Sequence, residues 1–327
     1  MLEAIDKTRF RGRKVGVVTG GTSSERDISL MTGRGFAEAL GDLGYQVEVY
    51  DVPEDLERLA GDCPAAVLLG LHGGAGENGV LQGFLEANGI PYTGSGVLGS
   101  ALAMDKGRAK AVIQESGVPT PWGVMLSTDE ELDIQEVFGS LDRAGVAFPV
   151  IAKPNAEGSS VGVTVCEHED DLEEALDVLW SMDAHVLVEE FIDGPEYTVG
   201  FFDRECLGAI EVVPADGFYD FESKYESSKT RYEPVEDEDL LLRLESLGRD
   251  AYNAVGCRGV ARVDFKARTE EDDTMLYALE VNTIPGMTPT SLVPKLAERR
   301  GVGFAEFTEY MLAAADCRTD WRSDDSR

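Results

Sequence analysis

The sequence predicts an α/β protein in which an N-terminal doubly wound parallel sheet precedes two α+β regions. Short apolar runs alternate with helical patterns over the first hundred residues, which is the first observation behind this prediction. Strands and amphipathic helices then follow in mixed order, which is the second. The third is size, since 327 residues with 43% hydrophobic side chains suffice for two or three buried cores.

Three strands and two helices account for the N-terminal region. The apolar runs Lys14–Thr19, Tyr45–Tyr50 and Ala65–Gly70 predict buried strands, and helical patterns cover Asp27–Leu40 and Val80–Ala87. Such alternation favours a parallel sheet with helices on both faces. A glycine pair follows the first strand, but the full GxGxxG of a dinucleotide-binding fold is missing, so a Rossmann oxidoreductase is not indicated.

The chain changes character near Met104. A helix is predicted at Lys106–Ser116, and the clearest helix covers 172–179, where apolar residues recur at i, i+3, i+4 and i+7 beneath an acidic outer face. Two further helical patterns cover 240–251 and 304–311. The predicted strands are Phe148–Lys153, Val161–Val165, His185–Glu190, Tyr197–Phe202, Leu207–Val213, Val260–Lys266 and Met275–Val281.

Two segments fit neither period. The polar, aromatic-rich segment 214–233 is long for an irregular connection. Loops above about 12–15 residues are usually functional lids or disordered, so we expect a mobile loop here. The C-terminal segment 317–327 also lacks periodicity and is expected to be a flexible tail.

The charge excludes several classes of partner. There are 62 acidic residues against 29 basic ones, a net charge of −33. Such a surface repels nucleic acid and anionic lipid, so neither is expected to bind. We interpret the acidity as adaptation to a high-salt cytoplasm, where salt screens self-repulsion. No apolar run approaches the roughly 20 residues of a membrane span, no secretion signal is recognisable, and the five cysteines form no CxxC pair. We therefore expect a cytoplasmic protein.

The loop 153–162 combines a lysine with small residues. Lys153 ends a predicted strand, and Gly158 and Ser159 in the following loop allow backbone N–H groups to approach an anion. A point charge beside a flexible cradle is typical of phosphate binding. An ordinary hairpin with turn residues is the alternative for this segment taken alone.

Polar residues recur at i, i+2 on two later strands. Arg262 and Asp264 share one face of their strand, as do Glu280 and Asn282. If the strands are neighbours, three oxygen-bearing side chains meet, and oxygen ligands without histidine or cysteine suit a hard cation such as Mg²⁺. Arg262 would stabilise developing negative charge. The alternative is a row of outward-facing polar positions, but the turn containing Gly286 follows directly.

A glycine-rich segment follows the third strand. His72 begins it, and ligands of doubly wound sheets bind beyond the carboxyl ends of strands. A histidine that merely caps a turn is an equally weighted alternative. His168 and His185 lie in no motif and are interpreted as surface residues.

Taken in order, these segments resemble the D-alanine:D-alanine ligases of the ATP-grasp superfamily. The resemblance extends from about residue 14 to 315, and the order of its nine motifs makes it specific. They are GGTSSERDISL (20–30), LHGGAGENGVLQG (71–83), PYTGSG (91–96), MDK (104–106), IAKPNAEGSSVGV (151–163), GPEYTV (194–199), FYDFESKY (218–225), ARVDF (261–265) and LEVNTIPGMTPTSLVP (279–294).

The resemblance implies an ATP-grasp fold in which two α+β domains clasp ATP. Its boundaries correspond to a Rossmann-like domain at 1–103, a central lid domain at 104–188 and a catalytic domain at 189–316. The mobile loop 214–233 belongs to the last of these, and the tail follows it.

The resemblance also implies roles for single residues. The ATP-binding positions correspond to Lys106, Lys153, Glu189, Phe191, Ile192, Glu196 and Lys224. The ligands of two Mg²⁺ or Mn²⁺ ions correspond to Asp264, Glu280 and Asn282. The catalytic positions correspond to Glu25, Ser159, Tyr225, Arg262 and Gly286, and the substrate-binding positions to Glu25, His72, Ser291 and Leu292.

The implied activity is ATP-dependent joining of two D-alanine molecules through an acyl phosphate, by a homodimer. Tyr225 favours peptide over ester formation. Three positions depart from the family pattern: Ala156 replaces a common arginine, Glu190 a frequent lysine and Asn78 a frequent aspartate. Glu190 brings an acid near the adenine. A related ATP-grasp ligase for other amino or hydroxy acids, and a non-catalytic nucleotide-binding relative, are the alternatives.

Overall fold

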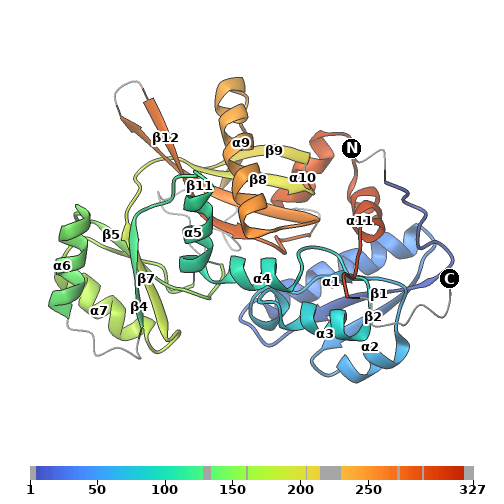
Figure 1. Ribbon diagram of the computed structural model, residues 1–327. Coiled ribbons are helices and arrows are strands. Elements are labelled where there is room, and N and C mark those ends of the chain that lie inside the picture. The colour runs from blue at the N-terminus through green and yellow to red at the C-terminus, as the bar shows by residue number, and fades with distance from the viewer. Residues whose placement is uncertain are drawn as a thin grey trace.

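Three sheets and their covering helices make up the protein, for which we use a computed structural model (Figure 1). It describes residues 5–127, 134–159, 161–203, 205–213, 230–270, 273–288 and 291–319. The blue N-terminal lobe and the green lobe lie at opposite ends of the view, and the large sheet lies above and between them. The order of sheets along the chain agrees with the predicted α/β architecture.

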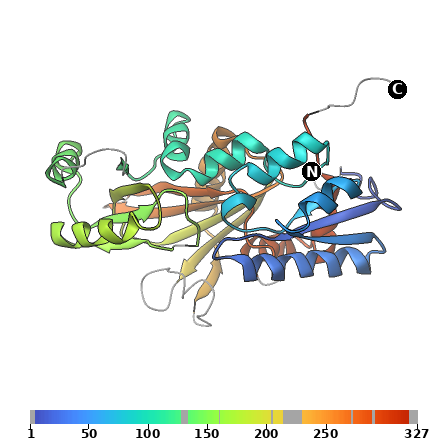
Figure 2. The ribbon, with the colours of Figure 1, turned by 90° about the horizontal axis from the view of Figure 1, so that it is seen from below.

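The first sheet is parallel, as predicted. Its strands are β1 (Lys14–Gly20), β2 (Gln46–Val52) and β3 (Val67–Leu69), in the order β2-β1-β3. Apolar residues of α1 (Arg26–Asp42) pack on one face. The other face packs against α2 (Leu56–Asp62) and α3 (Val80–Asn88). Figure 2 shows the blue strands between the helices of these two faces. The sheet is doubly wound because its strands are apolar on both sides.

The green lobe is a four-stranded antiparallel sheet with helices on one face. The strands are β4 (Gly123–Ser127), β7 (His185–Glu190), β5 (Val150–Pro154) and β6 (Thr164–Cys166), in that spatial order. Alternate residues of β5 and β7, such as Ala152 and Val188, are buried beneath α6 (Ile134–Ala144) and α7 (Glu169–Leu179). The intervening residues, including Lys153 and Glu189, point to the opposite face because side chains alternate along a strand.

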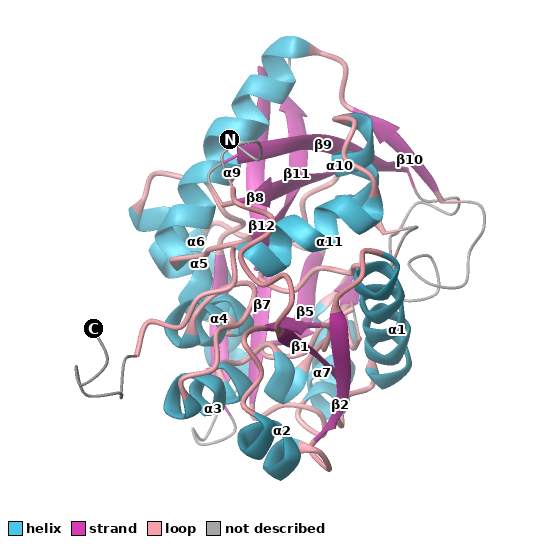
Figure 3. Cartoon of the chain, turned by 90° about the vertical axis from the view of Figure 1, so that its right-hand side faces the viewer, coloured by secondary structure: helices cyan, strands magenta, loops and turns pink. Residues whose placement is uncertain are grey.

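The largest sheet has five antiparallel strands. Their order is β10 (Arg231–Pro234), β9 (Glu205–Val213), β8 (Glu196–Phe202), β11 (Val260–Glu270) and β12 (Asp273–Asn282). One face is covered by α4 (Val97–Met104), α5 (Lys106–Glu115) and α9 (Glu238–Val255). On the other face lie α10 (Leu292–Arg299) and α11 (Phe304–Ala313), whose apolar residues also pack on α1 and the first sheet (Figure 3). The first and largest sheets therefore share one core.

Two predicted boundaries differ from the structure, while the domain boundary at 104 stays a prediction. Ala109 and Ile113 of α5, the helix that follows this boundary, pack in the core of the largest sheet. The predicted loop 214–233 ends in a strand, because β10 pairs with β9 from Arg231 onwards; residues 214–229 lie outside the described ranges. The strand expected at Val161–Val165 begins only at Thr164, after Gly162 adopts a φ of 74°.

The predicted C-terminal tail also begins too early. Asp316 bridges Tyr92, and the backbone N–H of Thr319 donates to the carboxylate of Glu86 at 2.7 Å. Residues 320–327 lie outside the described part of the chain. Within the described part, none of the helices has the length and apolarity that crossing a bilayer requires.

Candidate active site

Two adjoining pockets lie where the three sheets meet. The first, called here the lysine pocket, spans about 840 Å³, open solvent at its mouth included, between the green lobe and the largest sheet, and Lys106, Lys153 and Lys266 line it. The second, the wide pocket, spans about 1520 Å³ on the same measure and reaches the ends of the N-terminal strands. Lys106 and Glu280 line both pockets, so the two form one continuous site.

Four polar residues of β11 and β12 face this junction. Asp264 lies directly opposite Glu280, and Arg262 lies opposite Asn282. Side chains directly opposite on antiparallel strands have Cβ atoms about 4.5–5.5 Å apart, so the four share one face. The strand register shifts directly after Asp264, where a bulge interrupts the pairing. Such bulges re-aim neighbouring side chains and are frequent beside active sites.

Asp264 is held on both sides. Arg262 Nε and Nη2 donate to its carboxylate at 2.9 and 2.8 Å, and Thr198 Oγ1 donates to Oδ1 at 2.7 Å. The arginine fork and the carboxylate are complementary in shape, which fixes both groups. Asn282 Oδ1 accepts from the backbone N–H of Ile284 at 3.0 Å. The acidic ligands predicted from the sequence therefore converge, with Arg262 beside them.

The lysine pocket gathers charged groups from β5, β7 and α5. Lys153 Nζ donates to Glu189 Oε1, and both side chains are almost fully buried. Lys106 Nζ lies 3.9 Å from Glu280 Oε2. Asn155 connects the elements, because its Oδ1 accepts from the N–H of Gly107 at 3.0 Å. This contact holds the N-terminus of α5 against the loop that follows Lys153.

Glu25 and Ser159 meet at the wide pocket, although they come from different lobes. Ser159 Oγ donates to Glu25 Oε1, and a φ of 52° places Ser159 in the left-handed region. Non-glycine residues adopt this conformation rarely and mostly at functional sites. Two glycines give the carboxylate room, since a Cβ on Gly73 or Gly158 would lie 2.8 or 2.9 Å from Glu25 Oε2.

His72 is buried with both ring nitrogens engaged. Nδ1 lies 3.0 Å from the carbonyl oxygen of Ile284, which only accepts, so Nδ1 carries the proton. Nε2 then accepts from Thr32 Oγ1 at 3.0 Å. His72 lines the wide pocket, and its hydrogen bonds connect the N-terminal sheet to the loop after β12. Its role in substrate binding stays a prediction.

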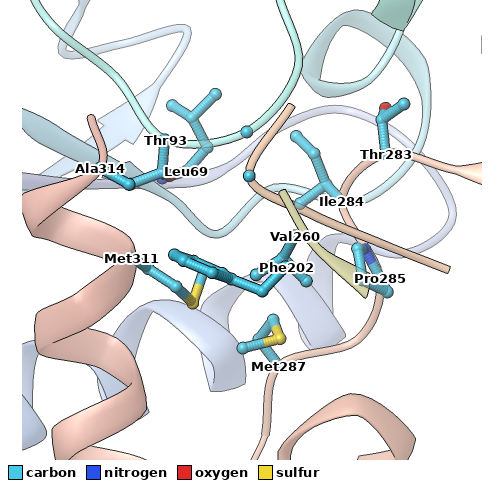
Figure 4. A pocket seen from close by; sticks show the side chains of 12 residues that line it. Leu69, Thr93, Phe202, Val260, Thr283, Ile284, Pro285, Met287, Met311 and Ala314 are labelled. Carbon is cyan, nitrogen blue, oxygen red and sulfur yellow. The ribbon is translucent and has the colours of Figure 1, made fainter. Parts of the chain in front are cut away.

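The loop after β12 carries Gly286 past the wide pocket to the start of α10. Thr288 and Ser291 hydroxyls lie 2.8 Å apart, and the N–H of Thr288 donates to Ser291 Oγ at 3.1 Å. Leu292 is the first residue of α10, whose N-terminal N–H groups suit a carboxylate. Behind the loop, Ile284, Met287, Phe202 and Met311 surround a small apolar pocket, which Figure 4 shows in close-up.

Comparison with known proteins assigns the chain to a family. A family profile described as "D-ala D-ala ligase C-terminus" matches residues 112–313. The D-alanine–D-alanine ligase of Syntrophotalea carbinolica is 41% identical over 96% of this chain and 100% of its own length. That of Geobacter sulfurreducens is 42% identical over 95% and 97%. The chain belongs to the D-alanine–D-alanine ligase family.

Solved structures of this family agree with the fold. The D-alanine–D-alanine ligase of Bacillus anthracis complexed with ATP superposes with a TM-score of 0.80 at 34% identity, covering 93% of this chain and 97% of that one. A D-Ala:D-Ser ligase of Enterococcus faecalis gives 0.79 at 26% identity, covering 93% and 99%. The ATP-grasp fold expected for a D-alanine–D-alanine ligase is confirmed.

Glu190, which departs from the family pattern of D-alanine–D-alanine ligases, is neutralised locally. Its Oε2 accepts from Arg268 Nη2 at 3.1 Å, and its Oε1 accepts from the N–H of Trp122 at 3.1 Å. Phe191 and Ile192 follow it along the rim of the lysine pocket. Glu196 also lines that pocket, and its Oε2 lies 3.8 Å from Lys266 Nζ. Arg268 therefore serves as the counter-ion of Glu190.

Three residues at or next to the candidate active site were not predicted from the sequence of this D-alanine–D-alanine ligase family member. Lys266 lines the lysine pocket, Glu77 lies 3.7 Å from His72, and Lys110 contacts Glu189. Burial is the largest influence on Glu77 and raises its pKa. Spacing on one helix offered the only signal for Lys110, which stands four residues after Lys106. Lys224 and Tyr225 lie outside the described residues.

Proposed function

We propose that this protein is an ATP-dependent ligase that joins two D-alanine molecules. The carboxylate of the first D-alanine attacks the γ-phosphorus of ATP, the bond to the β-bridging oxygen breaks, and ADP leaves. The amine of the second D-alanine, having lost a proton, attacks the carbonyl carbon of the acyl phosphate, and phosphate leaves as the peptide bond forms. Family membership and the charged junction of the two pockets support this proposal.

The nucleotide is assigned to the lysine pocket. Lys106 and Lys153 supply positive charge for the phosphates, and the rim formed by Phe191 and Ile192 receives the adenine. Glu196 is assigned to the ribose. Lys224 is assigned to the phosphates from a segment outside the described residues.

The divalent metal is assigned to Asp264, Glu280 and Asn282. Their side chains share one face and offer only oxygen donors, the donor set that Mg²⁺ and Mn²⁺ prefer. The residues present therefore fit two such ions, which when bound neutralise charge on the phosphates of ATP. Arg262, on the same face, is assigned to the oxyanion that develops at the carbonyl carbon, together with the N–H of Gly286.

The wide pocket is assigned to the two amino acids. The Glu25 carboxylate would bind the ammonium of the first, and Ser159 holds that carboxylate in place. Ser291, together with the N–H of Leu292 at the start of α10, would bind the carboxylate of the second. Tyr225 is assigned to the closing loop. Enclosure matters because water hydrolyses acyl phosphates, and residues positioned beforehand lower the barrier without moving.

One observation carries the proposal: on β11 and β12, Arg262 lies opposite Asn282 and Asp264 lies opposite Glu280. Lys106 lies beside this group, 3.9 Å from Glu280. The test measures phosphate release with ATP, Mg²⁺ and D-alanine or L-alanine in KCl, and identifies the product by mass. We expect phosphate release with D-alanine but not with L-alanine. The product should have the mass of a D-alanyl-D-alanine dipeptide. A product containing another amino or hydroxy acid in preference would assign a different ligase of the superfamily.

Arg262→Ala tests the same proposal from the enzyme side. Loss of one oxyanion donor typically lowers kcat by about 10²–10³. Arg34→Ala, which removes an equal charge from the exposed face of α1, is the control and should leave turnover unchanged. Near-normal turnover of Arg262→Ala would contradict the assignment, and ATP binding without turnover in the unmodified protein would favour the non-catalytic relative.

Three further expectations belong to the proposal. The functional unit is a homodimer, the protein acts in the cytoplasm, and the green lobe is the lid that moves over ATP. Size-exclusion chromatography with light scattering tests the first of these directly.

A further inference from the structure

Lys110 occupies an unusual place for a lysine. It lies one helical turn after Lys106 on α5, and its side chain is only 7% exposed. Lysines are almost never buried unless they are paired. Lys106 lines the lysine pocket, whereas Lys110 borders a different pocket together with Asn155 and Leu187. One residue connects Lys110 to Lys153 of the lysine pocket.

Glu189 is that residue. Its Oε2 lies 2.8 Å from Lys110 Nζ, while its Oε1 accepts from Lys153 Nζ. The contact with Lys110 is a buried ion pair, and the side chain of Glu189 is only 1% exposed. One carboxylate from β7 thus bridges an ammonium from α5 and another from β5.

Lys110, Glu189 and Lys153 form a buried triad whose net charge bears on phosphate binding. Burial alone would raise the pKa of Glu189, but the two ammonium groups lower it, so the carboxylate is ionised. Burial lowers the pKa of Lys110 to about 8. With one carboxylate between two lysines the triad keeps a net positive charge, whereas a pair of Glu189 and Lys153 alone would be neutral and would hold its lysine away from a phosphate.

We propose that Lys110 is a positioning residue that keeps Lys153 available to the nucleotide phosphates by sharing Glu189. When Lys153 turns to a phosphate, Lys110 still satisfies the buried carboxylate, which would otherwise be left unpaired at high cost. The inference rests on the assignment of the nucleotide to the lysine pocket. It assigns Lys110 a part in ATP affinity without contact to ATP.

The test compares the effect of Lys110→Met in the unmodified protein with its effect in the Glu189→Gln variant. Methionine keeps length but removes the charge, so Glu189 binds Lys153 alone. We expect the Kd for ADP with Mg²⁺ to rise about tenfold, the size typical of one lost charge-assisted contact. In the Glu189→Gln background Lys153 has no carboxylate to hold it, so adding Lys110→Met should change the Kd for ADP by less than about twofold. A lysine that only supports the fold predicts the same loss in both backgrounds.

Calorimetric ADP binding is the measurement because it needs no amino acid. If the protein used other amino acids, the proposed function would be wrong, but the ADP-binding result would still test the role of Lys110. Lys14→Met is the matched control, since Lys14 pairs with Asp62 at 3.1 Å on the surface, and its loss changes net charge equally. Unchanged ADP affinity in Lys110→Met, or an equal loss when Lys110→Met is added to Glu189→Gln, overturns the inference.

Folding is followed by thermal melting of every variant. If Lys110→Met does not fold, Lys110→Arg and Lys110→Gln replace it, since the first keeps the charge and the second removes it. ADP binding within about twofold of the unmodified protein for arginine, with about tenfold weaker binding for glutamine, supports the inference. Equal binding by the two variants overturns it.

Discussion

Ser159 illustrates what a single residue contributes and what the sequence could say about it. Its place in a glycine- and serine-rich loop predicted close approach to an anion, and its hydroxyl donates to a carboxylate, that of Glu25. The family resemblance implied this partner, but no local pattern encodes it, because the loop folds back toward the N-terminal lobe. The left-handed backbone of Ser159, with a φ of 52°, aims the hydroxyl at that carboxylate.

Gly158→Ala should impair the amino-acid site selectively. The new Cβ would lie 2.9 Å from Glu25 Oε2, so the carboxylate must move. We expect the KM for D-alanine to rise about tenfold, equivalent to ~1.4 kcal/mol, with the KM for ATP unchanged. Gly41→Ala is the control, because a Cβ there meets no atom within 4 Å. Steady-state kinetics decide, and an equal rise in both KM values would count against the placement of Glu25.

At the scale of elements, the sequence located most strands and helices but not all of their neighbours. A helix was predicted at Lys106–Ser116, whereas the packing of α5 on the largest sheet was not, since a helical pattern does not show which surface covers it. The strand β10 is four residues long, too short for a period to be recognised. The C-terminal segment is ordered up to Thr319 by a polar contact with α3 rather than by periodicity.

Glu86→Gln tests that contact. Glu86 accepts from Tyr92 Oη at 2.9 Å and from the N–H of Thr319 at 2.7 Å, and glutamine keeps only one acceptor oxygen. We expect a loss of about 1–2 kcal/mol in the free energy of unfolding at pH 7. Urea unfolding measures it, with the exposed Glu38→Gln on α1 as control.

The difference in free energy of unfolding between Glu86→Gln and the unmodified protein should also depend on pH. Partial burial would raise the pKa of Glu86, but hydrogen bonds from Thr319, Tyr92 and Cys317 outweigh it and lower the pKa to about 2. A carboxyl with a lowered pKa stabilises the fold fully above its ordinary value of 4.5 and loses that stabilisation as pH falls toward 2. The gap between Glu86→Gln and the unmodified protein should therefore shrink below pH 4.5. A gap independent of pH would show that the carboxylate charge is not responsible.

At the scale of the whole molecule, net charge is the dominant feature. A charge of −33 repels itself in the compact state, and about 1 M salt shortens the screening length to roughly 3 Å. The interpretation as salt adaptation stays a prediction.

Thermal melting in KCl tests it. We expect the Tm to rise by at least about 5 °C between 0.1 and 1 M KCl, equivalent to ~2 kcal/mol for a chain of this size. Sucrose, an uncharged osmolyte, is the control for effects other than screening. A Tm that does not change with KCl, or that rises equally in sucrose, would contradict the interpretation.

The amino-acid sequence alone shows which residues carry charge, how they are spaced on strands, and which segments bury an apolar side. It therefore predicted that Asp264 shares a face of its strand with Arg262, and Glu280 a face of another strand with Asn282. The fold was needed to show that these strands are neighbours, that both nitrogens of His72 are engaged, and that Lys110 shares Glu189 with Lys153. The physical reason is range: periodicity is set by residues a few positions apart, whereas each of these contacts joins segments far apart in the chain.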